Sequence, residues 1–270
     1  MKTKPLRGMK IIVTSLIFIQ VIFANPGWAA ETVNVGLSVF PPFIEKEKED
    51  GTYSGIAVEL LHAMNAFQDT YRFVGVSTSA SRKQRDFTNG VYDMVPFDDL
   101  NWGWQGYPVE ASRVILSGDG EVFIALAEAG RGEEYFADFR QKKMVGFRGY
   151  HYKFADFNAD PDYLKKTFNM LLPTNPQSCI EMILHQRGDI AVVTKSYLLR
   201  YLAEHPEARD KLLISQKMDQ EYQHTFIIRQ GIRPSVAELN DMLDQMEQQG
   251  ILQRLWQAHG LDKIDGASAK

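Results

Sequence analysis

The sequence predicts an α/β fold built from two successive units, each with a mainly parallel sheet flanked by helices. Short apolar segments rich in β-branched residues alternate with segments of helical periodicity, and this alternation begins again near residue 144. The length agrees, because about 240 of the 270 residues remain after a short N-terminal targeting segment, which is enough chain for two lobes.

The first unit opens with a strand at residues 32–39, where apolar and polar residues alternate until Pro41 and Pro42. The charged residues 45–51 predict the tip of a solvated hairpin. After Gly55 a helix is predicted from apolar residues at helical spacing, namely Ile56, Leu60, Met64 and Phe67. The unit continues with a strand at 71–76, a polar helix at 79–89 and strands at 93–97 and 121–126.

The second unit is predicted to contain strands at 144–147, 190–193 and 224–229, with helices at 178–186 and 195–204. Pro234 suits the first turn of a further helix, which places Leu239, Met242, Leu243 and Met246 on one face. Gly250 ends that helix, and a last short helix is expected at 251–259.

Residues 1–30 have the three parts of a cleavable secretory signal peptide. Four basic residues precede an apolar run at 11–23, and the small residues Gly27 and Ala29 favour cleavage after Ala29 or Ala30. The run is shorter than the roughly 20 apolar residues that span a bilayer, so an uncleaved anchor is the weaker alternative. We therefore expect a periplasmic protein that is not inserted in the membrane after cleavage.

Composition restricts the partners and the chemistry. Without the four basic residues of the signal, 26 Lys and Arg stand against 34 Asp and Glu, a formal charge of −8 that argues against nucleic acid as a partner. Cys179 is the only cysteine and cannot form an internal disulfide. The six histidines form no pair at metal-ligand spacing, so we expect no metal, no cofactor and no catalytic residue.

Several stretches together resemble the bacterial family 3 solute-binding proteins, which deliver polar amino acids to ABC importers. The likeness lies in an opening strand, an aromatic-Pro-Phe loop, a glycine-led first helix, a Gly-x-x-Asp step in the first unit, the matching Gly-x-Asp-type step in the second unit and the closing helices. These features occupy residues 33–36, 40–43, 51–61, 89–93, 187–193 and 239–261.

The resemblance implies the two-lobed periplasmic binding protein fold, with two hinge strands and the ligand in the cleft between the lobes. We assign residues 1–30 to the signal peptide, 31–126 and 224–270 to lobe 1 and 127–223 to lobe 2, with crossings near 125–130 and 220–226. The implied partners are a small-molecule solute and a membrane ABC permease or receptor. We expect a monomer.

The family pattern also points to site residues. Phe40 takes the place of the aromatic residue that packs on the ligand, and Arg113 is the nearest candidate for the carboxylate clamp, although its spacing is longer than the pattern. Tyr150 and His151 occupy the second-lobe turn. Thr194 stands where the family has an aspartate for the ligand's amino group.

This replacement suggests that the first lobe supplies the partner of a positive group. Asp98 and Asp99 follow Phe97 in the predicted site loop, next to an aromatic insertion that contains Trp102. Aromatic faces attract cations by roughly 0.5–2 kcal/mol when partly desolvated. We therefore expect a ligand that carries a positive group and contacts this loop.

These residues also have structural alternatives. Phe40 can belong to the core. Asp98 and Asp99 can cap a helix, lie in a solvated turn or pair with Arg113, and Trp102 can pack inside or form a partner surface. His151 suits the cap of a helix as well as a hydrogen bond to a ligand.

Three functions compete. A binding protein closes its lobes on an amino acid or related amine-bearing compound and presents it to an importer. An enzyme resembling cyclohexadienyl dehydratase would use a cleft carboxylate or histidine, namely Asp98, Asp99 or His151, for acid–base catalysis. A sensing module would present its closed state to a membrane receptor. We favour the binding protein.

Overall fold

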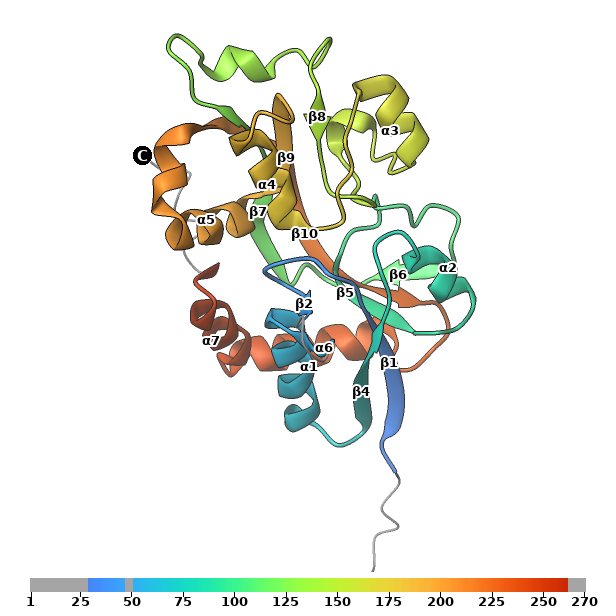
Figure 1. The fold of residues 1–270 in the computed structure, drawn as a ribbon. Helices are drawn as coiled ribbons and strands as arrows, with labels where there is room; N and C mark the ends of the chain where they lie inside the picture. The colour runs from blue at the N-terminus through green and yellow to red at the C-terminus, as the bar shows by residue number, and fades with distance from the viewer. Residues whose placement is uncertain (1–28, 47–50, 262–270) are drawn as a thin grey trace, which may run out of the picture.

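The computed structural model describes residues 29–46 and 51–261, which form two lobes joined by two long strands (Figure 1). Residues 1–28 of the predicted signal peptide and residues 47–50 of the predicted hairpin tip lie outside the described residues.

The first lobe combines the N-terminal elements with the last two helices. Its elements are β1 (Glu31–Leu37), β2 (Glu45–Lys46), β3 (Tyr53–Ser54), α1 (Ile56–Phe67), β4 (Tyr71–Ser77), α2 (Lys83–Thr88), β5 (Met94–Asp98), β6 (Val109–Ala111), α6 (Val236–Gln248) and α7 (Ile251–Ala258). The capping box of Ser235 and Glu238 starts α6, because each residue accepts a hydrogen bond from the other's backbone N–H.

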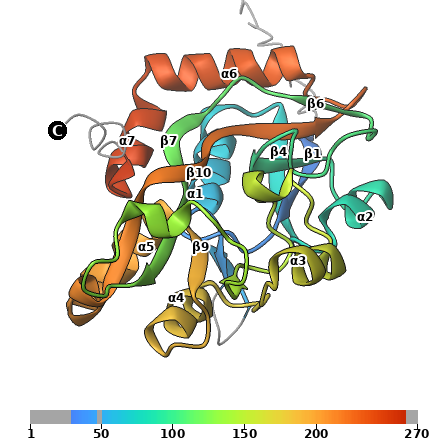
Figure 2. The same cartoon turned by 90° about the horizontal axis from the view of Figure 1, so that it is seen from above.

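The second lobe is formed by the middle of the chain. Its elements are β8 (Met144–Val145), α3 (Pro161–Phe168), α4 (Pro176–Leu184), β9 (Ile190–Thr194) and α5 (Lys195–Glu204), with short 3₁₀ turns at Glu133–Phe136, Lys153–Ala155 and Pro206–Lys211. In Figure 2, α3 lies on one side of β9, and α4 and α5 lie on the other.

Two strands pass from one lobe to the other, β7 (Leu116–Leu126) and β10 (Leu212–Arg229). They pair antiparallel between Leu116 and Leu126, and they join the sheets in the order β4-β1-β5-β10-β7-β9-β8, with β6 beside β10. The outer pairs β1–β4, β1–β5 and β8–β9 are parallel. Both lobes thus have parallel outer strands, and the antiparallel pairs lie at the connecting strands.

The sheet is covered on both faces in each lobe. In the first lobe, α1, α6 and α7 bury one face, and a smaller cluster around Phe87, Tyr92 and Trp104 buries the other. In the second lobe, α4 and α5 cover one face, and α3 with the segment around Phe136 covers the other. The predicted α/β architecture is therefore confirmed.

Strand pairing and the hydrophobic cores indicate where the chain first passes from one lobe to the other. Residues 121–124 of β7 pair with the second-lobe strand β9, and Val122 and Ile124 pack in the second-lobe core. This pairing favours a crossing several residues before the proposed boundary at residue 126. At the other connecting strand, Thr225 and Ile227 of β10 pair with β5 of the first lobe.

Some elements differ from the sequence prediction. α2 is shorter than the predicted helix at 79–89, whereas β7 and β10 begin well before residues 121 and 224. The early part of β10 was missed because polar residues dominate it, as suits a strand between two lobes. α3 was also missed, although Asp160 caps it and Pro161 opens it, which is a recognisable start signal.

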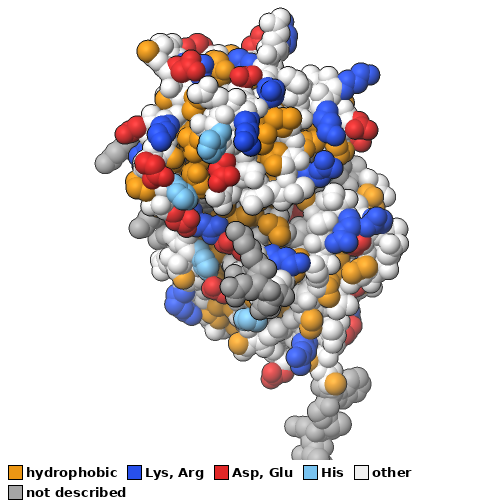
Figure 3. Space-filling model, viewed as in Figure 1, with side chains coloured by type: hydrophobic (Ala, Val, Ile, Leu, Met, Phe, Trp, Pro, Cys, Tyr) orange, Lys and Arg blue, Asp and Glu red, His pale blue; other side chains and the backbone are white. Residues whose placement is uncertain are grey.

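Charged side chains of both signs are interspersed over both lobes on the face drawn in Figure 3. One cross-lobe contact is ionic, because the Arg200 guanidinium on α5 binds the Glu45 carboxylate on β2 through both Nη atoms. The lobes are thus in contact at the rim of the cleft as well as at the hinge.

Candidate functional site

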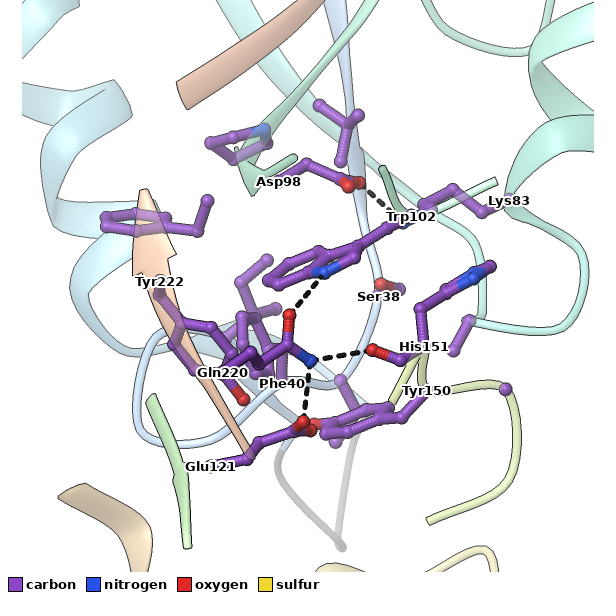
Figure 4. Close-up of a pocket in the computed structure, with 17 residues that line it drawn as sticks. Ser38, Phe40, Lys83, Asp98, Trp102, Glu121, Tyr150, His151, Gln220 and Tyr222 are labelled. Carbon is purple, nitrogen blue, oxygen red and sulfur yellow. Dashed lines mark hydrogen bonds and ion pairs between the residues drawn. The ribbon is translucent and has the colours of Figure 1, made fainter. Parts of the chain in front are cut away.

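A cavity of about 40 Å³ lies between the lobes, beside the two connecting strands. Its lining comes from both lobes: Phe40, Lys83, Asp98 and Trp102 from the first, Tyr150 and His151 from the second, and Glu121, Gln220 and Tyr222 from the connecting strands (Figure 4). A water molecule needs at least about 10–15 Å³ of such volume. A solute the size of an amino acid therefore enters only when the lobes part or these side chains move.

An ion pair forms part of the first-lobe wall. Lys83 Nζ lies 2.5 Å from Asp98 Oδ2, and the two side chains are 9% and 3% exposed. The other carboxylate oxygen of Asp98 accepts hydrogen bonds from Trp104 Nε1 and from the Asp99 backbone N–H. Asp98 thus has its charge matched within its own lobe.

The backbone at the end of β5 turns Asp98 inward. Phe97 has a φ of 54°, in the left-handed region, and the register between β5 and β10 shifts opposite it. Its ring stacks on Phe43 with a centroid distance of 5.1 Å, so Phe97 packs in the core and also borders the cavity. A non-glycine residue in this conformation costs about 1–3 kcal/mol, which the surrounding packing must offset.

A chain of hydrogen bonds crosses the cleft. Trp102 Nε1 donates to Gln220 Oε1 at 3.1 Å, and Gln220 Nε2 donates to Glu121 Oε2 and to the His151 carbonyl oxygen, each at 2.6 Å (Figure 4). The amide of Gln220 therefore links a first-lobe tryptophan to a carboxylate and to the second-lobe turn. Any opening of the lobes must break part of this chain.

Aromatic rings surround this corner. The ring centroid of Phe40 lies 5.8 Å from that of Trp102, 5.4 Å from that of Tyr150 and 5.7 Å from that of Tyr222, all in edge-on arrangements. Phe40 is thus both buried and a cleft residue, which combines the two alternatives that the sequence left open. Rings from both lobes meet only because the fold brings residues 40, 102, 150 and 222 to one place.

Burial controls the ionisation of the cleft residues. Glu121 is 1% exposed, and its pKa is raised well above the usual value by desolvation first and then by the charge of Asp219. Desolvation, followed by the charge of Lys83, lowers the pKa of His151 to about 4, so its imidazole is neutral at neutral pH. Desolvation also keeps Tyr150 and Tyr222 neutral, because it raises the pKa of each phenol well above 10.

His151 is held in place by its own turn. Its Nδ1 lies 2.7 Å from the carbonyl oxygen of Phe157, and the ring approaches Gly103 of the first lobe so closely that a β-carbon there would lie 2.8 Å from Cε1. Gly103 has a φ of 80°. Glycine is thus needed both for the turn and for the approach of the second lobe.

Six of the nine predicted site residues line the cavity: Phe40, Phe97, Asp98, Trp102, Tyr150 and His151. Thr194 lies just behind them, buried, with its Oγ1 3.3 Å from the Tyr222 hydroxyl. Asp99 organises its own turn instead, since its Oδ1 accepts from the backbone and side-chain N–H groups of Asn101.

The structure does not bring Arg113 to the cavity. Its Nε lies 2.7 Å from Asp244 Oδ1, and its Nη2 lies 2.6 Å from Glu247 Oε2, both on α6 of the first lobe. The pattern-based role as carboxylate clamp therefore has no support from its position.

Sequence reasoning missed Lys83, Glu121, Gln220 and Tyr222. Only Glu121 carried a signal, as an acidic residue at the head of the apolar segment 122–126. Within the described residues, no cluster of His, Cys, Asp and Glu is suited to a metal ion, and no helix is both long and apolar enough to cross a bilayer.

Comparisons with known proteins agree on the fold. No family model matches the chain, and no curated protein matches it. Among solved structures, an ancestral arginine-binding protein bound to arginine aligns with a TM-score of 0.66 and 18% identity, over 86% of this chain and 100% of that one.

Two further structures relate to the two alternative functions, the enzyme and the sensing module. An ancestral amino-acid-binding protein that is a precursor of cyclohexadienyl dehydratase aligns at a TM-score of 0.61 and 17% identity, over 84% of this chain and 94% of its own. A histidine kinase sensor domain with similarity to periplasmic binding proteins aligns at a TM-score of 0.65 and 16% identity, over 86% of this chain and 97% of its own. The expected resemblance in fold is confirmed, and at these identities it is the fold that is shared.

Proposed function

We propose that this protein binds a small polar solute with an amine group between its lobes and presents it to a membrane ABC importer. The observation that carries the proposal is the cavity whose aromatic and polar side chains come from both lobes and both connecting strands. Such a cavity is complete only when the lobes are together, which is how a solute stabilises a closed form that a partner recognises.

The proposal includes export. Removal of residues 1–30 leaves an acidic periplasmic protein, acting as a monomer with a small solute and a membrane permease as partners. The arginine-binding, amino-acid-binding and sensor-domain neighbours support a solute-binding role for this fold.

Thermal unfolding of residues 31–270 tests the proposal. After bound solutes are stripped, the midpoint is measured with panels of amino acids, amines and small carboxylates. A ligand that binds only the folded protein adds about 2.7 kcal/mol of stability at a hundredfold excess over its Kd. Trp102→Ala should remove the shift, whereas Trp256→Phe on α7, outside the cavity, should keep it. No shift with any panel would contradict the proposal.

An enzyme is the second candidate, for one reason. Glu121 is a carboxyl group with a raised pKa beside aromatic rings, which is the property of a general acid. A dehydratase of cyclic carboxylic acids would also need a cation for the substrate's carboxylate, and the cavity's lysine is already paired with Asp98. Incubation with such acids, followed by NMR, should show no substrate loss. Turnover that disappears in Glu121→Gln would instead support the enzyme.

A sensing role would use the same closure with a different partner. Capture of the liganded protein by an ABC permease in membranes, and not by a receptor, is the result that the proposal expects.

A further inference from the structure

The charged side chains that line the cavity do not balance. They are Lys83, Asp98 and Glu121, and the first two neutralise each other at 2.5 Å. Glu121 belongs to none of the ion pairs formed within residues 29–46 and 51–261, and its carboxylate accepts from the neutral amide of Gln220. Once ionised, Glu121 leaves the cavity with one negative charge that no cation of the described residues matches.

The titratable groups that face Glu121 are acidic or phenolic: Asp119 on the same strand, Asp219 and Tyr222 on β10, and Tyr150 and Tyr152 in the second-lobe turn. Desolvation raises the pKa of Asp119 and raises that of Asp219 to about 6, and the charges of Lys195 and Lys153 partly oppose these two rises. The acidic and phenolic groups around Glu121 thus favour a positive charge at this corner of the cavity.

The walls of this corner suit a cation as well. Phe40, Trp102, Tyr150 and Tyr222 line the same cavity as Glu121, and Figure 4 shows the Glu121 carboxylate beside Tyr150 and Gln220. Aromatic faces carry negative potential and attract ammonium groups. If the Gln220 amide swings away, the Glu121 carboxylate and the Trp102 indole become available together, since both are bonded to it.

A carboxylate on the ligand would find no comparable partner among the described residues that line the cavity. Arg113 is bound to Asp244 and Glu247 on α6, away from the cavity. Lys83 is committed to a buried aspartate, and drawing it away would leave the Asp98 charge unmatched.

On the basis of the proposed solute-binding function, we propose that Glu121 binds the positive group of the ligand and that the ligand is an organic amine without a carboxylate. Once the amino group of an α-amino acid is paired with the ionised Glu121, its carboxylate would add a negative charge that Lys83, already paired with Asp98, does not match. The inference therefore departs from the amino acids bound by the structural neighbours.

The proposal has a proton balance. Burial favours the protonated form of Glu121, and an ammonium ion at this corner favours the carboxylate. Binding of a cation then releases a proton from Glu121 to solvent, and affinity rises with pH until Glu121 is ionised in the free protein or the amine itself loses its proton.

Calorimetric titration with matched pairs tests the proposal: tyramine against tyrosine, histamine against histidine, and arginine as a cation that keeps its carboxylate. Each amine should bind at least about tenfold more tightly than its amino acid, because the carboxylate adds an unmatched charge. Titration in two buffers of different ionisation enthalpy should show proton release on amine binding.

Variants complete the test. Glu121→Gln should weaken amine binding at least about thirtyfold and abolish proton release. Glu110→Gln is the matched control, because Glu110 is an exposed carboxyl on β6 outside the cavity, and the amine affinity of this variant should stay within about threefold. Unfolding curves verify that both variants are folded.

Each failure has a different meaning. Tighter binding of the amino acids than of the amines would overturn the ligand class and leave solute binding intact. Equal affinity of Glu121→Gln and the unaltered protein for an amine would overturn the role of Glu121. Binding of neither amines nor amino acids nor carboxylates by the folded protein would overturn the proposed function as well.

Discussion

Lys83 Nζ and Asp98 Oδ2 lie 2.5 Å apart in the first-lobe wall of the cleft, and both side chains are buried. Because Trp104 and the Asp99 amide complete the hydrogen bonds of Asp98, this pair is part of the folded structure and not only of the binding surface. Mutation of the pair can show how much it contributes to the stability of the fold.

Lys83→Met should lower the free energy of unfolding by about 3–5 kcal/mol, because it leaves the Asp98 charge buried without a partner. The double variant Lys83→Met/Asp98→Asn should lose less, since it removes the unmatched charge too. Urea unfolding at pH 7 measures both. If the free energy of unfolding of Lys83→Met fell by less than about 1 kcal/mol, the Lys83–Asp98 pair would be accessible to solvent in solution.

Arg113→Ala tests whether Arg113 binds the ligand, as the family pattern implies, or only contacts α6, as its ion pairs indicate. The guanidinium is bound to Asp244 and Glu247, so the substitution should cost only about 1 kcal/mol or less of stability and leave ligand affinity unchanged. A double-mutant cycle with Glu247→Gln, read by urea unfolding, should show coupling. Loss of binding in folded Arg113→Ala would restore the clamp hypothesis.

The Arg200–Glu45 pair should favour the closed form. The two side chains are 36% and 34% exposed, so solvent screens much of their attraction, and a loss of no more than about fivefold in ligand affinity is expected for Arg200→Met. X-ray scattering should show a larger radius of gyration without ligand. Arg209→Gln, an exposed arginine of the same lobe, is the control and should behave like the unaltered protein.

Stability should depend on pH through Glu121. The folded protein raises the pKa of Glu121 above its unfolded value, so it holds this proton more tightly than the unfolded chain does. The favourable contribution is complete below the unfolded pKa of about 4.3 and is lost as pH rises through the folded pKa.

Glu121→Gln has no proton to lose. Relative to the unaltered protein, it should therefore gain stability between pH 5 and pH 8, as measured by urea unfolding at several pH values. Asp219, whose pKa desolvation raises to about 6, contributes with the same sign in both proteins, and its negative charge adds to the rise in the pKa of Glu121. A pH-independent difference would mean that Glu121 titrates normally.

Local sequence was enough to predict most elements of the fold. Helix α5 and strand β9 begin where their patterns predicted, because apolar spacing follows the burial of one helix face or of a whole strand. The polar half of β10 and the short β6 escaped, since their pairing depends on partners far along the chain.

The site was less accessible to sequence reasoning. Phe40, Asp98, Trp102, Tyr150 and His151 were predicted because the family pattern and their chemistry marked the loops that carry them. Arg113 was chosen by nearness in sequence, but the segment after β6 leads its side chain to α6.

The sequence by itself determined the alternation of strands and helices and the loops that face the cleft, because both follow from local periodicity and turn chemistry. Only the tertiary structure decided which charges meet. Glu121 and Gln220 lie 99 positions apart and become bonded where β7 and β10 run side by side. Burial at that junction, which no local pattern encodes, raises the pKa of Glu121 and leaves it without a cation.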